Sequence, residues 1–176
     1  MARGFPDRLF IAVDTNPESL SRIARQAGRK PSRGGVSNLL CIAEAAEALG
    51  QQLPGVADQV SVILPWGRLL RTVAEPNLED LRNIVALGQT GATFEVLFSY
   101  DPCIDGQGRG PLGTGGLDEK HVKDKLPAAY ELVGLAVKEV KRVSLNELKT
   151  YATTWAKRLA HGRAREVWRI KAVRRA

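Results

Sequence analysis

The sequence has little cysteine and no long apolar run, and each absence excludes a class of protein. Its 176 residues include only two cysteines, Cys41 and Cys103. Cys41 lies in an apolar strand pattern and Cys103 in a loop, so we expect neither a disulfide framework nor a metal site. No apolar run approaches the roughly 18 residues that cross a membrane, and the opening MARGFPDRLF lacks the apolar segment of a secretory signal. We expect a cytoplasmic protein without a membrane partner.

Common catalytic signatures are also missing. The two histidines, His121 and His161, have no neighbouring signature, and neither G-x-S-x-G nor H-E-x-x-H occurs. The glycine-rich stretch 103–116 is no dinucleotide fingerprint, because no strand and helix frame it. Nothing before Arg8 supplies a glycine-rich turn either. The sequence therefore gives no indication of hydrolysis and lacks the usual nucleotide-binding loop.

Basic charge is abundant and gathers in two places. Hydrophobic residues make up 44% of the chain, as in globular proteins. The formal net charge is +7 and the sequence pI is about 9.7, which suits a polyanionic partner such as nucleic acid. One cluster comprises Arg22, Arg25, Arg29, Lys30 and Arg33, and the other Lys157, Arg158, Arg163, Arg165, Arg169, Lys171, Arg174 and Arg175. They are either two solvated faces or a split phosphate-binding surface.

Short apolar stretches alternate with helical patterns along the chain. Strands are expected at 8–14, 38–43, 59–64, 92–100, 137–143 and 166–173. Helices are expected at 17–29, 43–50, from Gly67, at 77–87, at 117–135 with a kink or break at Pro127, and after Ser144, whereas GQTG at 88–91 is expected to turn the chain. This alternation predicts βαβ units, a mostly parallel sheet and a C-terminal antiparallel pair of strands, all in a single domain over 1–176.

Five side chains stand out as candidates for function or core. Asp14 ends the first strand, where it could hydrogen-bond a ribose or cap the next helix. Local sequence favours a solvated helix position for Glu47. Trp66, in ILPWGRLL, follows the third strand at the edge where open α/β sheets bind ligands. Trp155 lies in the basic run TTWAKRLAHGRAR, which has the composition of a base-stacking site, although it could also pack under the sheet. Trp168 alternates within a strand and is expected in the core.

Five stretches of the sequence together resemble the 16S ribosomal RNA (adenine-1408-N1)-methyltransferases, which are aminoglycoside-resistance enzymes. These stretches are DRLFIAVDTN, RKPSRGGVSN, AEAAEAL, VILPWGRLLR and TTWAKRLAHGRAR. Their order and spacing agree over nearly the whole chain, and the paired tryptophan motifs are the most specific part. The resemblance implies a Rossmann-like class I methyltransferase fold with S-adenosyl-L-methionine as cofactor. It also implies that a monomer methylates N1 of one adenine in the decoding region of the 30S ribosomal subunit.

The resemblance also implies roles for individual residues. Trp66 and Trp155 match the two rings that hold the flipped adenine. The cofactor-binding positions are Asp14 at the ribose, Ala46 and Glu47 beside the adenine, Leu64 and Pro65 in the pocket, and Thr153 and Thr154 towards the methionine end. The RNA-binding positions are Lys30 and Arg33 in a basic turn, and Arg158 and Arg163. No catalytic base is required, because N1 of neutral adenine carries a free lone pair.

One departure from the family is expected to matter. The family has, ahead of the point where this sequence begins, a strand that carries a GTGDG-like cofactor loop. We therefore expect an N-terminally truncated methyltransferase domain that binds the cofactor weakly or not at all, and micromolar binding in a calorimetric titration would contradict this. The alternatives are a non-catalytic RNA-binding remnant and a methyltransferase for another RNA site. A nucleotide-binding oxidoreductase is less well supported, because the glycine fingerprint is absent.

Overall fold

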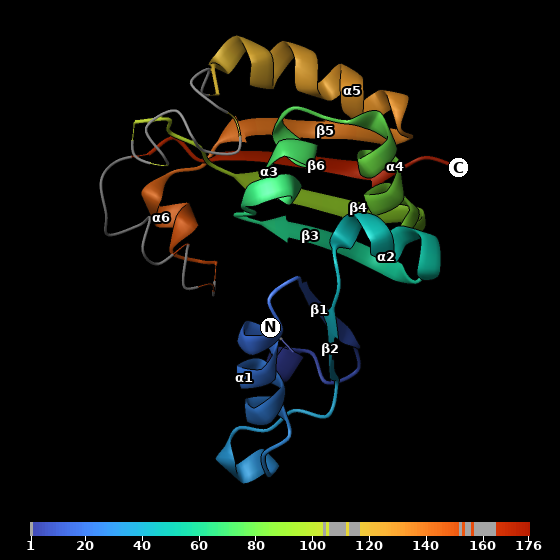
Figure 1. The fold of residues 1–176 in the computed structure, drawn as a ribbon, viewed down its shortest axis with the longest axis vertical. Helices are drawn as coiled ribbons and strands as arrows, with labels where there is room; N and C mark the ends of the chain where they lie inside the picture. The colour runs from blue at the N-terminus through green and yellow to red at the C-terminus, as the bar shows by residue number, and fades with distance from the viewer. Residues whose placement is uncertain are drawn as a thin grey trace. The chain divides into compact units, whose positions relative to one another are not determined.

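The computed structural model describes residues 2–103, 105, 112, 117–151, 153, 156 and 165–176. The chain divides into two compact units, Met1–Leu49 and Gly50–Ala176 (Figure 1). Each unit contains one of the two sheets, with two strands in the first and four in the second. The expectation of a single domain over 1–176 stays a prediction.

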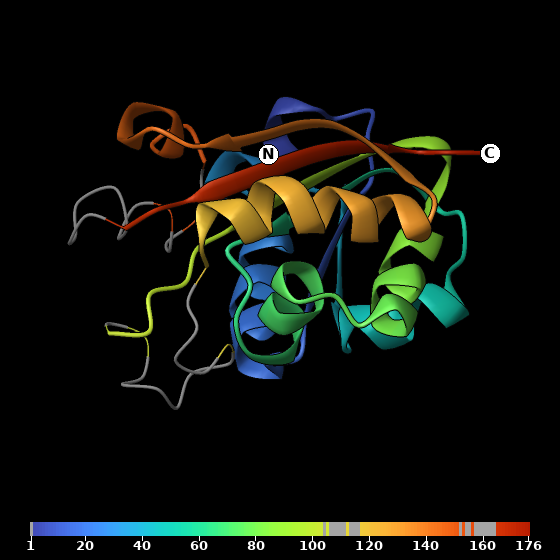
Figure 2. The same cartoon turned by 90° about the horizontal axis from the view of Figure 1, so that it is seen from above.

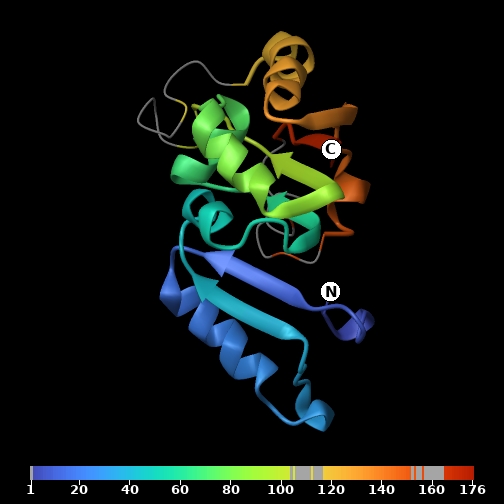
Figure 3. The same cartoon turned by 90° about the vertical axis from the view of Figure 1, so that its right-hand side faces the viewer.

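The first unit is a βαβ unit. Strands β1 (Phe10–Asp14) and β2 (Leu39–Ala43) pair in parallel, and α1 (Pro17–Ala27) lies along them (Figure 3). The side chain of Asn16 accepts hydrogen bonds from the first free N–H groups of α1, which explains why the helix begins there. Both strands and the helix were predicted from the sequence and are confirmed.

The second unit is built on a mixed sheet in the order β3-β4-β6-β5. Strands β3 (Ala57–Ile63) and β4 (Gly88–Phe98) run parallel, and β6 (Trp168–Arg174) is antiparallel to both β4 and β5 (Leu135–Arg142). The predicted C-terminal antiparallel pair is therefore confirmed. In the sheets described, β1 and β3 each have one hydrogen-bonded neighbour.

The main core lies on one face of this second sheet. Phe94, Val96 and Phe98 of β4 alternate inward, as do Trp168 and Ile170 of β6. They pack against α3 (Gly67–Ala74), α4 (Leu78–Ala86) and α5 (Leu126–Leu132), and Figure 2 shows α5 lying along β5 and β6. Trp168 is fully buried, as expected from the alternation of its strand.

The opposite face of the sheet has a smaller core at one end. Its buried residues are Leu97, Leu148, Tyr151, Ala156 and Val167, and the partly buried Ile63, Leu64 and Val143 pack against them. We call this set the end core. Leu148 closes α6 (Leu145–Leu148), and the Ser144 side chain caps this helix by accepting from Glu147 N.

Two local predictions were wrong in detail. GQTG lies inside β4 rather than in a turn. Between the pairs Ala57↔Gly88 and Gln59↔Thr93 the β3–β4 register shifts, and Gly91 within this irregular stretch has φ +81°. Of the kink or break expected at Pro127 in the helix 117–135, the break does not occur, while the kink stays a prediction. Residues 121–125 form a π-helical turn in which Leu126 N donates to His121 O, and α5 continues from there. Since Pro127 has no N–H, the regular helical hydrogen bond at that point is lost in any case.

Within the part of the chain that the structure describes, no helix is long and apolar enough to cross a membrane. The same residues contain no group of three or more His, Cys, Asp or Glu side chains placed to hold a metal ion. Both cysteines are free thiols, with Cys103 exposed.

Candidate functional site

The turn from β3 into α3 holds Trp66 in an unusual backbone. Leu64 adopts a left-handed conformation with φ +51°, and Gly67 follows with φ +61°. A left-handed backbone costs a non-glycine residue roughly 1–2 kcal/mol, so other contacts must hold Leu64 in place. Its N–H donates to Leu97 O at 2.7 Å, and its side chain packs against the end core. These two contacts fix the direction in which the chain leaves β3.

Trp66 itself is presented to solvent at the carboxyl end of β3. It is 53% exposed, although it is one of the largest apolar side chains of the protein. Its indole ring lies against Tyr100, with ring centroids 6.4 Å apart and planes tilted by 44°. Tyr100 is buried at 6% exposure and follows the end of β4, the strand beside β3. Trp66 therefore has a buried aromatic neighbour and retains a free surface on which a planar base can stack.

A buried ion pair connects the segment after β4 with the segment that leads into β6. Arg165 Nη1 lies 2.5 Å from Asp105 Oδ1, and both side chains are largely buried. The other Asp105 oxygen accepts from Asp101 N. Arg165 is the last residue of TTWAKRLAHGRAR, so the end of that basic run is held beside the carboxyl end of β4.

The start of the same run is held by the end core. Tyr151 and Ala156 are buried in it, and they bracket Thr153, whose Oγ1 accepts from Ala156 N at 3.0 Å. Four of the predicted site residues lie outside the described residues: Thr154, Trp155, Arg158 and Arg163. Their predicted roles stay predictions.

In the first unit, the structure excludes one of the two local interpretations of Asp14 and contradicts the local interpretation of Glu47. Asp14 is exposed at the end of β1, and its Oδ1 accepts from Asn16 N at 2.8 Å. The helix cap is Asn16, so the capping interpretation of Asp14 is wrong, while its ribose-binding role stays a prediction. Glu47 is 6% exposed in the first turn of α2 (Ala46–Gln52), so the solvated interpretation is wrong too. A buried carboxylate is the rarer and more informative case.

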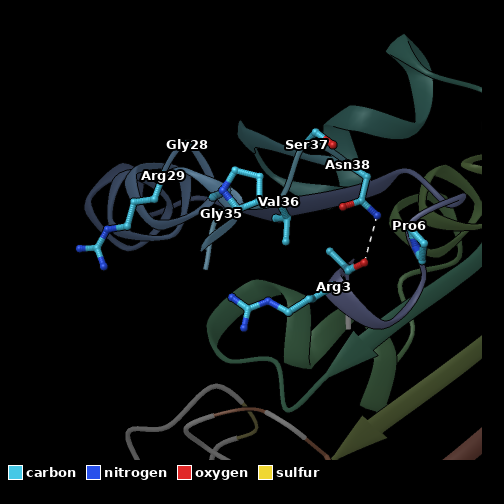
Figure 4. A pocket seen from close by; sticks show the side chains of 11 residues that line it. Arg3, Pro6, Gly28, Arg29, Gly35, Val36, Ser37 and Asn38 are labelled. Atoms are coloured by element: carbon cyan, nitrogen blue, oxygen red, sulfur yellow. Dashed lines mark hydrogen bonds between the residues drawn. The ribbon is translucent and has the colours of Figure 1, made fainter. Parts of the chain in front are cut away.

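The basic turn follows α1 as a short 3-10 helix, Pro31–Arg33. Lys30 and Arg33 are exposed, and neither has an ion pair among the described residues. The N-terminal segment packs beside this turn, because Arg3 donates to Gly34 O at 2.6 Å and Asn38 Nδ2 donates to Ala2 O at 3.0 Å (Figure 4). A pocket lies between the two segments.

Two further residues, one in each unit, escaped the sequence reasoning. Arg3 adds a cation beside the basic turn, but nothing in MARGF indicates that it folds back onto residue 34. Tyr100 was taken only as the end of a strand. Its position at the end of the strand next to β3 was a signal, since neighbouring parallel strands end at the same edge of a sheet.

Comparison with known proteins agrees with this geometry. The family model described as NpmA, 16S rRNA (adenine(1408)-N(1))-methyltransferase, matches residues 1–174. A protein of that name from Escherichia coli is 32% identical over 162 residues, which are 92% of this chain and 74% of the relative.

Solved structures give the same result. The 16S rRNA methyltransferase KamB superimposes with a TM-score of 0.86 at 29% identity, covering 99% of this chain and 80% of that protein. A variant of the 16S rRNA (adenine(1408)-N(1))-methyltransferase from Catenulisporales acidiphilia, crystallised with the cosubstrate SAM, gives a TM-score of 0.84 at 30% identity over 99% and 79% of the two chains. The fold is thus the Rossmann-like methyltransferase fold that the resemblance implied. This chain belongs to the family of 16S rRNA (adenine(1408)-N(1))-methyltransferases.

Proposed function

We propose that this protein transfers the methyl group of S-adenosylmethionine to N1 of adenine 1408 in 16S rRNA, and thereby confers aminoglycoside resistance. Family membership supports the reaction. The observation that carries it on this chain is Trp66, a half-exposed indole on a constrained turn at the ligand-binding edge of the sheet, backed by the buried Tyr100 ring.

The residues proposed for the cofactor have suitable chemistry. In the first unit, only Oδ1 of Asp14 has a described partner, so Oδ2 is free to accept from ribose hydroxyls. Ala46 and the buried Glu47 begin α2, and the Glu47 carboxylate could accept from an adenine amino group. In the second unit, Leu64 and Pro65 are half-buried at the end of β3. Thr153 and Thr154 are assigned to the methionine end of the cofactor.

The proposed chemistry needs no catalytic base. S-adenosylmethionine supplies an electrophilic methyl group, and the N1 lone pair attacks it directly. The protein has to flip the target base out of the folded RNA, which costs a few kcal/mol. Stacking on an aromatic ring returns roughly 1–3 kcal/mol per base. Trp66 and Trp155 together could therefore offset most of that cost, and the rate enhancement would come from positioning.

We further propose that the substrate is the assembled 30S subunit and that a cytoplasmic monomer acts on it as a single domain. Lys30 and Arg33 would contact RNA phosphates, since both are exposed and have no acidic partner among the described residues. Arg158 and Arg163 are assigned the same role. The Arg165–Asp105 pair would hold the end of that basic run in place.

Primer extension on 30S subunits tests the proposal. Subunits treated with protein and S-adenosylmethionine should give a stop next to adenine 1408, and omission of the cofactor is the control. RNA binding without any stop would favour the alternative of a non-catalytic RNA-binding protein, and a stop elsewhere would indicate another RNA site. Calorimetric titration with the cofactor separates weak cofactor binding from failure of the chemical step.

A further inference from the structure

The end core contacts both segments on which the proposed function depends. Leu64, two residues before Trp66, packs against it from the end of β3. Tyr151 and Ala156 are buried in it and bracket positions 153–155 of the sequence. The positions of the Leu64–Gly67 turn and of Thr153 therefore both depend on how this small core packs.

The Tyr151 hydroxyl ties the end core to the sheet. It donates to Glu95 Oε1 at 2.8 Å and accepts from Arg169 Nη1 at 3.4 Å. Glu95 lies in β4 and Arg169 in β6, so one hydroxyl connects the chain after α6 with two neighbouring strands. A phenyl ring would fill the same apolar volume without either hydrogen bond.

Arg169 is the centre of a wider network on this face of the sheet. Its side chain is 8% exposed and pairs with Glu139 of β5 and with Glu147 of α6, both at 2.7 Å. Lys141 pairs with the same Glu147 oxygen at 2.9 Å. A guanidinium buried this deeply needs acidic partners in fixed directions. The network therefore holds α6, and the chain that leaves it, at one position against β5 and β6.

The pKa shifts of Tyr151 and Arg169 favour the protonated forms that these hydrogen bonds require. Burial raises the pKa of Tyr151, so its hydroxyl keeps its proton at neutral pH and remains a donor to Glu95. Burial alone would lower the pKa of Arg169, but the hydrogen bonds to Tyr151 and Glu139 outweigh it and raise that pKa. Arg169 and Lys141 pair with the carboxylates of Glu139 and Glu147, while Glu95 accepts from the neutral Tyr151 hydroxyl.

We propose that Tyr151 is a positioning residue: its hydroxyl, held by Glu95 and Arg169, sets the position of the Thr153 segment relative to the Trp66 turn. Only the predicted effect of Tyr151 on catalysis rests on the proposed function. The hydrogen bonds themselves predict that the segment loosens when the hydroxyl is removed, whether or not the protein methylates RNA.

Tyr151→Phe tests this with Tyr130→Phe as matched control. Tyr130 is fully buried in the main core, and its hydroxyl donates to Val73 O at 3.0 Å, so both variants lose one buried hydroxyl. Tyr151→Phe should lower kcat about tenfold while KM for each substrate stays within about twofold, because a misplaced group costs rate rather than binding. Tyr130→Phe should leave kcat unchanged.

Hydrogen exchange gives the readout that needs no turnover. Tyr151→Phe should speed amide exchange in residues 145–151 at least fivefold, whereas Tyr130→Phe should not change it. Equal losses of kcat in the two variants, or unchanged exchange in Tyr151→Phe, would overturn the proposal. If the unmutated protein gives no methylation, the proposed function fails, and the exchange comparison alone decides on Tyr151.

Discussion

Replacing Trp66 by alanine should separate its role in binding RNA from its part in the fold. The ring is 53% exposed, so its loss leaves no closed cavity, and its main described contact is Tyr100. An aromatic pair contributes about 0.5–1.5 kcal/mol beyond area burial, so we expect the free energy of unfolding to fall by about 1 kcal/mol. A lost stacked base costs about 1–3 kcal/mol, which lowers kcat/KM roughly 5- to 150-fold.

The assay is the initial rate of methyl transfer to 30S subunits, with urea denaturation in parallel. Leu132→Ala is the control. Leu132 is 68% exposed on α5, so this substitution also removes an exposed apolar side chain. Trp66→Phe should retain part of the activity, since a smaller ring still stacks. The reasoning is refuted if Trp66→Ala methylates at the normal rate, or if its loss of activity only follows a large loss of stability.

Three further predictions concern charge and backbone. The hydrogen bond from Lys141, together with Arg169, holds the pKa of Glu147 below its usual range. The resulting stability is present above the unfolded-state pKa and lost as pH falls through the lower folded-state pKa, so Glu147→Gln should destabilise the protein at pH 7 but not under acid conditions, as measured by thermal unfolding. Gly67→Ala should cost about 1 kcal/mol in urea denaturation, because the added methyl meets open space and only the positive φ opposes it. Changing both Lys30 and Arg33 to Glu should weaken 30S binding and reduce the slope of log K against log salt by about 2 in a filter-binding titration.

Each of these has a discriminating control. Arg82→Glu makes one such charge reversal at an exposed site on α4, and a loss of 30S affinity equal to half that of the double variant on a free-energy scale would indicate a general effect of net charge instead. A destabilisation by Glu147→Gln that persists in acid would mean that the carboxylate acts through packing rather than charge. Unchanged stability in Gly67→Ala would show that the turn relaxes to another backbone conformation.

Local patterns determined most of the secondary structure. Short apolar stretches and, near the C-terminus, alternating patterns predicted the six strands that the structure describes, and the helical spacing with Asn16 and Ser144 as caps predicted where two of the helices begin. Such features depend on residues within a few positions of one another, so they can be read from a single sequence. The bulge at Gly91 was missed, because it depends on the register of β4 against β3.

Part of the candidate site was predicted from the sequence, and part was decided only by the tertiary structure. The sequence by itself put Trp66 at a strand end, identified the two basic clusters and carried the family resemblance. Only the tertiary structure decided that Glu47 is buried, that Tyr100 lies against Trp66, and that Leu64 is held in a left-handed conformation. The Tyr151 hydroxyl joins residues 56 positions apart, and Arg165 pairs with a residue 60 positions away. Contacts at such separations depend on how strands pair and pack, so no local pattern of residues could have specified them.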